Sequence, residues 1–144
     1  MKKITDLQIG KAGEYLVCAD LIMQGYIAYL SEQGLHYDVV VDVDGKLLRI
    51  QVKTTRTYRQ VPQREKRTDA YLFNCRRCGK GGRHSYKDED LDIMAFVAAD
   101  AKLIGYLPIT KVRQTMMLRT HKLNYHGNKS GIYIEDLTLE KCFM

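Results

Sequence analysis

Asp38, Gln51 and Lys53 are polar residues set within two apolar, β-branched segments, residues 37–43 and 46–54. A carboxylate and an amide oxygen are hard ligands of the kind that Mg²⁺ prefers, and bound Mg²⁺ lowers the pKa of an attacking water. A lysine beside such a site can orient or deprotonate that water, or hold a phosphate oxygen. These residue types therefore indicate metal-assisted hydrolysis of a phosphodiester. The alternative is a common one, an Asp–Lys pair on the surface of a hairpin.

The two segments are separated by Asp44-Gly45, which is a typical two-residue hairpin turn. With this turn, Val41 faces Leu48 and Val39 faces Ile50, so the apolar residues meet on one face. A slip of one residue would place valine opposite arginine or glutamine, which supports this register.

The same register predicts where the three polar residues lie. Asp38 is expected directly across from Gln51, with about 5 Å between their Cβ atoms, and Lys53 lies two residues further along on the same face. The three side chains should converge at the open end of the hairpin, away from the turn.

A helix is predicted before the hairpin, over about residues 6–24. Thr5 and Gln8 form a capping-box pattern, and Gly25 is a natural C′ residue. Apolar residues recur through the segment at helical spacing: Leu7, Ala12, Leu16, Ala19 and Met23.

Glu14 lies on this helix, where an acid is usually exposed. However, Gly10 and Gly13 lie beside it, and each costs about 1 kcal/mol in helix propensity. We interpret these small residues as allowing close approach of the helix to another element.

The remaining pattern predicts a mixed sheet with a helix on at least one face, an α/β or α+β fold. No repeat, low-complexity tract or linker divides the chain, so a single domain over residues 1–144 is expected. Further strands are predicted at about residues 26–30, 70–76, 92–99, 102–107 and 132–135, and a short helix at 110–117.

The net charge of +6 is concentrated in one block. Residues 49–87 hold 12 Lys and Arg against two acidic residues, whereas the rest of the chain holds 11 basic and 15 acidic residues. Such a block favours a polyanion, with nucleic-acid phosphates as the leading candidate. A solvated, charged loop is the alternative. An anionic membrane is disfavoured, because the block has no amphipathic helical pattern.

Eight basic residues of this block are candidate DNA contacts. The first four follow the lysine strand and are expected near the site, and arginine there could read guanine from the major groove. The others fall in a basic, glycine-rich stretch that suits a phosphate backbone or a disordered loop tip equally well. The eight are Arg56, Arg59, Arg64, Arg67, Arg76, Arg77, Lys80 and Arg83.

Asp38…Gln51-x-Lys53, preceded by Gly10-x-x-Gly13-Glu14 on a helix, resembles the PD-(D/E)xK nuclease superfamily. The resemblance spans roughly residues 7–55 and is nearest to small intron-encoded homing endonucleases, in which Gln also occupies the middle position. Archaeal-type Holliday-junction resolvases come next. The resemblance implies a restriction-endonuclease-like core, with a mixed central sheet and an N-terminal helix packed on it.

The resemblance also implies roles. Glu14 matches the helix glutamate that assists metal binding, Asp38 the central metal-binding aspartate and Lys53 the catalytic lysine. Gln51 stands where Asp or Glu is usual, which removes one negative charge from the metal site. The implied cofactor is Mg²⁺, with Mn²⁺ as a substitute, held by Glu14, Asp38 and Gln51.

Three functions are compatible with these residues. The leading one is a site-specific homing-type endonuclease acting on double-stranded DNA as a homodimer or homotetramer, because one short chain has one site and a duplex break needs two. The second is a structure-specific junction resolvase, and the third is a catalytically inactive DNA-binding module.

The four cysteines lie in a chain whose first residues show no signal-peptide pattern, and no stretch is apolar enough for a membrane span. Reduced thiols and a cytoplasmic location are therefore expected. Cys75-x-x-Cys78 could be half of a zinc knuckle, but a structural Zn²⁺ is disfavoured because no second pair has matching spacing.

Overall fold

The computed structural model describes residues 2–58, 70–75, 77–79, 82–84, 90–123, 125 and 130–143, with the backbone alone for 77–79 and 82–84. Helix α1 spans Asp6–Met23 and begins as predicted. The Gln8 N–H donates to the Thr5 hydroxyl oxygen over 3.2 Å, and the Thr5 N–H donates to the Gln8 side chain over 2.8 Å. Gly25 follows the helix with a φ of 98°, the left-handed conformation that glycine adopts at a C′ position.

The face by which α1 packs differs from the predicted apolar spacing. Gly13, Val17 and Leu21 are buried against the sheet, whereas Leu7 and Met23 are 88% and 86% exposed. The helix carries apolar residues around most of its circumference, so periodicity alone could not select the buried side.

The strands form a five-stranded sheet in the order β1-β2-β3-β7-β8. Neighbours are antiparallel except β3 and β7, which are parallel. The strands are β1 (Ile27–Leu30), β2 (Val39–Val43), β3 (Lys46–Thr55), β7 (Ile93–Ala98) and β8 (Leu103–Pro108).

The β2–β3 hairpin has the predicted register. Val39 pairs with Ile50 and Val41 with Leu48. Asp44 and Gly45 have φ angles of 53° and 88°, the positive values that a type I′ turn requires at both central positions.

A second sheet, of order β10-β9-β4, packs on the other side of the first. A small hairpin and three 3-10 helices complete the described part of the chain. These elements are β4 (Tyr71–Asn74), β5 (Arg77–Gly79), β6 (Gly82–His84), η1 (Ile109–Lys111), β9 (Thr115–Arg119), β10 (Ile132–Tyr133), η2 (Ile134–Asp136) and η3 (Glu140–Phe143).

One sequence prediction fails in this region, and one segment left open by the sequence contains regular structure. Residues 110–117 do not form a helix: η1 is a single turn and β9 begins at Thr115. Met116 and Leu118 are buried in β9 and alternate with more exposed neighbours, because the strand pairs with β4. The basic stretch around residues 77–84 contains the β5–β6 hairpin rather than a loop alone.

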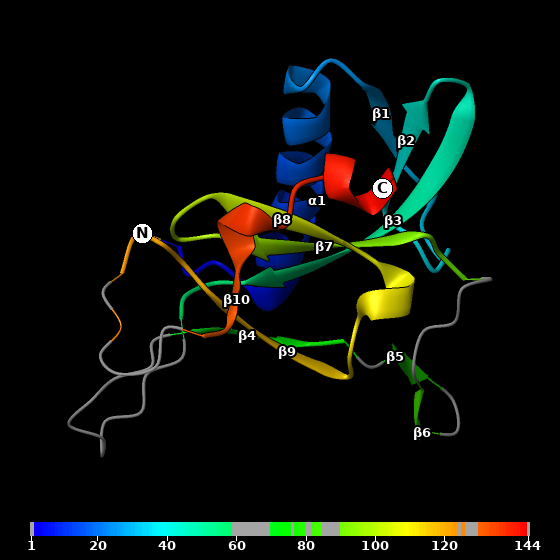
Figure 1. The fold of residues 1–144 in the computed structure, drawn as a ribbon. Helices are drawn as coiled ribbons and strands as arrows, with labels where there is room; N and C mark the ends of the chain where they lie inside the picture. Colours follow the sequence, from blue (N-terminus) through cyan, green and yellow to red (C-terminus); the bar gives the residue numbers. More distant parts are fainter. Residues whose placement is uncertain are drawn as a thin grey trace.

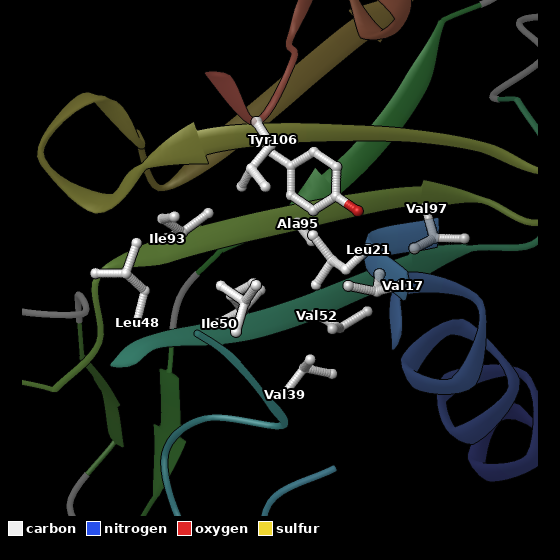
Figure 2. Packing of buried hydrophobic residues seen from close by; sticks show 12 residues of the cluster. Val17, Leu21, Val39, Leu48, Ile50, Val52, Ile93, Ala95, Val97 and Tyr106 are labelled. Carbon is white, nitrogen blue, oxygen red and sulfur yellow. The ribbon is translucent and has the colours of Figure 1, made fainter. Parts of the chain in front are cut away.

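Strand β7 lies at the centre of both cores and is buried along its whole length. Ile93, Ala95 and Val97 face the α1 side (Figure 2). Met94 and Phe96 face the second sheet. Figure 1 shows this layering, with α1 on one side of the five-stranded sheet and β4 and β9 on the other.

Helix α1 is held to the sheet by a polar contact as well as by apolar packing. The Tyr106 hydroxyl on β8 donates to the Asp20 carboxylate over 2.6 Å. Burial and the adjacent carboxylate both raise the pKa of Tyr106, so it stays a hydrogen-bond donor. In the part of the chain that is described, no helix is long and apolar enough to cross a membrane.

Candidate active site

Asp38 lies where the β2–β3 ladder ends. The Asp38 N–H donates to the Ile50 carbonyl over 2.8 Å, and the Val52 N–H donates to Asp38 Oδ2, also over 2.8 Å. The ladder stops at Val39 and Ile50, so Asp38 does not form the predicted direct pair with Gln51. Its carboxylate is instead held by this hydrogen bond from Val52, the residue between Gln51 and Lys53.

Burial and several neighbouring groups shift the pKa of Asp38. Burial is the main cause that raises the pKa of this carboxyl to about 6, and the negative charge of Glu14 adds to it. The Val52 N–H and the positive charges of Lys53 and Lys11 act in the opposite direction. The protein thus holds a partly buried carboxylate whose charge its neighbours compensate incompletely.

Glu14 lies on α1, and its charge raises the pKa of this carboxyl. Its side chain is 19% exposed and forms an ion pair with Lys11 over 3.2 Å, one turn earlier on the helix. The sequence reasoning omitted Lys11. Its spacing of three residues from Glu14 was the available signal, because residues so spaced share a helix face.

Lys53 and Gln51 are half-buried on β3, on the sheet face opposite the α1 core. Beside Lys53 in the adjacent strand β7 is Phe96, and beside Gln51 is Met94. The positive charge of Lys53 also reaches Cys75, where it partly offsets the burial that raises the thiol pKa to about 11. Two charges therefore act on Asp38, that of Glu14 from the helix and that of Lys53 from the strand.

The contact between α1 and β3 is closest at Gly13. A Cβ atom at this position would overlap the hydroxyl of Thr54 and would lie 3.0 Å and 3.1 Å from its Cβ and Cγ2. Gly13 therefore permits the close approach that the sequence suggested. Gly10 does not share this role, because a Cβ there would have nothing within 4 Å.

A cleft of about 280 Å³ opens beside the carboxylates. The first half of α1, with Glu14, forms one wall, and the loop from Ser31 to Asp38 forms the other. The loop is tied to the hairpin because the Ser31 N–H donates to the Asp38 carbonyl over 2.8 Å and the Ser31 hydroxyl donates to the Tyr37 carbonyl. Both carboxylates thus border one solvent-accessible space.

A larger groove, of about 510 Å³, shares Ser31 and Tyr37 with the cleft. Its floor is the outer face of β1–β2–β3, where Tyr29, Leu47 and Arg49 are found. Arg49 alternates with Gln51 and Lys53 along β3, so the groove continues the sheet face that carries those residues.

Arg49 is a second residue that the sequence reasoning did not single out. Its backbone N–H and its guanidinium Nε donate to Asp92 over 2.8 Å and 3.2 Å. Its guanidinium also lies 6.0 Å from the centre of the Tyr37 ring. These contacts fix the strand beside Gln51 to the start of β7.

Of the eight predicted DNA contacts, Arg56 is the one whose side chain is described. It donates to the Ile4 carbonyl over 2.8 Å and lies 3.7 Å from an oxygen of Asp6, so it holds the beginning of α1. Arg77 and Arg83 lie on the β5–β6 hairpin, of which the backbone alone is described. The others are outside the described residues: Arg59, Arg64, Arg67, Arg76 and Lys80.

The oxygen donors around Asp38 could hold a divalent cation. Within the described ranges, no group of three His, Cys, Asp or Glu side chains is placed to hold a metal. The candidate set instead has two carboxylates, Glu14 and Asp38, with the amide oxygen of Gln51 on the adjoining strand. The donors are hard oxygens, and a cation would compensate both the burial of the Asp38 charge and its repulsion by Glu14, so the set fits a hard divalent cation such as Mg²⁺ or Mn²⁺.

A helix-borne glutamate, an aspartate at the start of a hairpin and a lysine on the following strand, on a mixed sheet with α1 on one face, define a restriction-endonuclease-like nuclease core. The chain belongs to the PD-(D/E)XK endonuclease family, whose model matches residues 4–138. The resemblance inferred from the motif is thereby confirmed.

Known proteins that are similar to this chain include a phage protein and a solved bacterial endonuclease. Protein 5.3 of Escherichia phage T7 is 36% identical over 97 residues, which cover 66% of this chain and 75% of the phage protein. The solved structure of the bacterial homing endonuclease I-Ssp6803I matches with a TM-score of 0.67 at 19% identity, covering 88% of this chain and 86% of that one. The structural match confirms the predicted fold class.

Proposed function

We propose that this protein is a Mg²⁺-dependent endonuclease that hydrolyses phosphodiester bonds in double-stranded DNA, with residues 1–144 forming one nuclease domain. The observation that carries the proposal is the position of Asp38. Its carboxylate borders a cleft together with a second carboxylate, Glu14, and the positive charge of Lys53 acts on it. This arrangement provides a cation site and a positive charge beside it.

Each residue has a defined part in the proposal. Glu14, Asp38 and Gln51 would hold the cation, which supplies charge neutralisation and an acidified water when bound. Lys53 orients the water or neutralises a non-bridging phosphate oxygen. The Val52 N–H fixes the rotamer of Asp38, so that its second oxygen is left for the cation.

A site-specific, homing-type enzyme is the version of this function that we favour. The fold match to a bacterial homing endonuclease supports it, as does Gln51 in the middle motif position. Cutting both strands of a duplex with one site per chain calls for a homodimer or homotetramer. Positive charge from the block at residues 49–87 would bind phosphates on either side of the cut.

The test presents purified protein with three substrates in Mg²⁺: supercoiled plasmid, a four-way junction and a random-site duplex library. Lys53→Ala is tested beside the wild type, and Lys46→Ala, at the turn end of the same strand, is the matched control. We expect cleavage of library members that share a sequence, a loss of at least about 100-fold in Lys53→Ala, and near wild-type rates in Lys46→Ala.

Other results would change the assignment in defined ways. Equal cutting by wild type and Lys53→Ala would show that the proposed site is not the active site. Cutting confined to the four-way junction would make the protein a junction resolvase. Salt-sensitive DNA binding with every substrate intact in Mg²⁺ and Mn²⁺ would leave the inactive DNA-binding module.

A further inference from the structure

Helix α1 and strand β3 meet closely at a point adjacent to two candidate site residues. Gly13 directly precedes Glu14, and Thr54 directly follows Lys53. We propose that Thr54 is a positioning residue for metal binding: its hydroxyl, seated on the Cα of Gly13, sets the distance between helix and strand and thereby the place of Glu14 beside Asp38. The inference rests on the proposed function and deepens it.

The first observation is the closeness of the two backbones. A Cβ at Gly13 would overlap the Thr54 hydroxyl, so the oxygen fills the space that a side chain would occupy. A Cα–H group and a hydroxyl oxygen prefer a C···O distance of about 3.3–3.6 Å, whereas a Cα and a methyl carbon prefer a distance of about 3.5–4.0 Å. Replacing the hydroxyl by a methyl group would therefore increase the preferred distance between Gly13 and residue 54. The atom type at this position therefore sets how near α1 can lie.

The second observation is the state of the hydroxyl. Among the described residues, Thr54 Oγ1 is one of the buried side-chain oxygens without a hydrogen-bond partner. A buried polar group without a partner costs free energy, and valine of nearly the same shape would avoid the cost. Packing alone therefore does not account for threonine here, whereas a required short separation does.

The third observation links the contact to the site. Glu14 on the helix borders the same cleft as Asp38, and Lys53 follows Val52, whose N–H donates to Asp38 from the strand. The Gly13–Thr54 contact lies one residue from each of these two groups. A shift of α1 by a few tenths of an ångström changes the Glu14–Asp38 separation while leaving the Val17 and Leu21 packing able to adjust.

The experiment measures metal binding directly, by calorimetric titration of the DNA-free protein with Ca²⁺ and Mn²⁺, alongside Tm. Thr54→Val should weaken metal binding by about tenfold, as is typical when a residue that orients a metal ligand is substituted. Its Tm should be equal to or above that of the wild type. Thr54→Ser keeps the oxygen and should retain wild-type metal affinity. A Thr54→Val protein with unchanged metal affinity would overturn the inference.

A second pair of variants distinguishes a loss of positioning from a simple folding defect. Gly13→Ala should lower both Tm and metal affinity, and Gly13→Ala combined with Thr54→Ala should recover most of both, because the hydroxyl that overlaps the added methyl is removed. Gly10→Ala is the matched control and should bind metal as the wild type does, because nothing lies within 4 Å of the added methyl. Metal affinity that is equally weak in Gly13→Ala and in the double variant contradicts the proposal.

Asp38→Ala separates this inference from the proposed function. If Asp38→Ala binds metal as tightly as the wild type, the proposed metal site itself is wrong. If Asp38→Ala abolishes binding while Thr54→Val and Thr54→Ser both bind normally, the metal site stands and the positioning role of Thr54 is refuted.

Discussion

At the scale of the residue, Asp38 combines a structural cost with the function we propose for it. Its carboxylate is partly buried, accepts a hydrogen bond from Val52 and lies near the like charge of Glu14. A protein selected for stability alone would avoid this arrangement, because an ionised carboxylate loses hydration when it is buried. A site for a divalent cation requires it, since the cation binds the charged form.

The free energy of unfolding should reflect that cost. The folded pKa of Asp38, about 6, is above its ordinary value of 3.8, so the folded state binds more protons in this window. Metal-free stability therefore falls as pH rises from about 4 to about 6. Allowing for solvent screening at a half-buried group, the loss amounts to about 1 kcal/mol.

Asp38→Asn tests this relation in a single variant. The amide oxygen can still accept the Val52 N–H, while the charge is removed. We expect the variant to unfold at a higher urea concentration than the wild type at pH 8, with the difference disappearing near pH 4, and its cleavage activity to fall by at least about 100-fold. A variant less stable than the wild type at pH 8 would contradict this account of Asp38.

At the scale of the element, the β2–β3 hairpin determines which face of the sheet carries the polar residues. Asp44 and Gly45 both have positive φ, and the Gly45 N–H donates to the Asp42 carboxylate over 2.7 Å. The tight turn sets the register, and the register places Gln51 and Lys53 on the sheet face opposite Val39 and Val41.

Gly45→Ala is expected to destabilise the protein by about 1 kcal/mol, because an L-residue at this φ is strained. Asp44→Asn is the control, since asparagine tolerates the left-handed conformation and should leave stability within about 0.5 kcal/mol. Urea unfolding followed by circular dichroism measures both. Equal stability of the wild type and Gly45→Ala would show that the turn does not hold the register.

At the scale of the whole molecule, one copy presents one candidate site. The cleft between α1 and the loop from Ser31 to Asp38 has one Glu14 and one Asp38 on its borders, which under the proposed function would serve one strand of DNA. The proposed double-strand cleavage therefore predicts that the active species contains at least two copies.

Sedimentation velocity should show a dimer or a tetramer at the concentrations at which double-strand cleavage is observed. Mixing wild type with inactive Lys53→Ala should then yield nicked duplex, because hybrid assemblies cut one strand. A monomer that makes double-strand breaks in a single binding event would refute the requirement for two copies.

Much of the site could be predicted from local sequence. The capping box of α1, the Asp44-Gly45 turn and the Val39–Ile50 pairing all depend on residues of one continuous helix or hairpin. Local hydrogen bonding and alternation govern such features, so a single sequence contains the needed information. The family likeness of the motif followed from the same short stretch and is confirmed.

Long-range packing decided the rest. The buried face of α1, the strand rather than helix at Thr115–Arg119 and the parallel pairing of β3 with β7 depend on partners far away in the chain. The sequence by itself determined the hairpin, the helix and the polar residues they carry. Tertiary structure alone decided that Glu14 and Asp38 border one cleft and that Gly13 packs against Thr54, because burial and like-charge proximity arise only when separate elements come into contact.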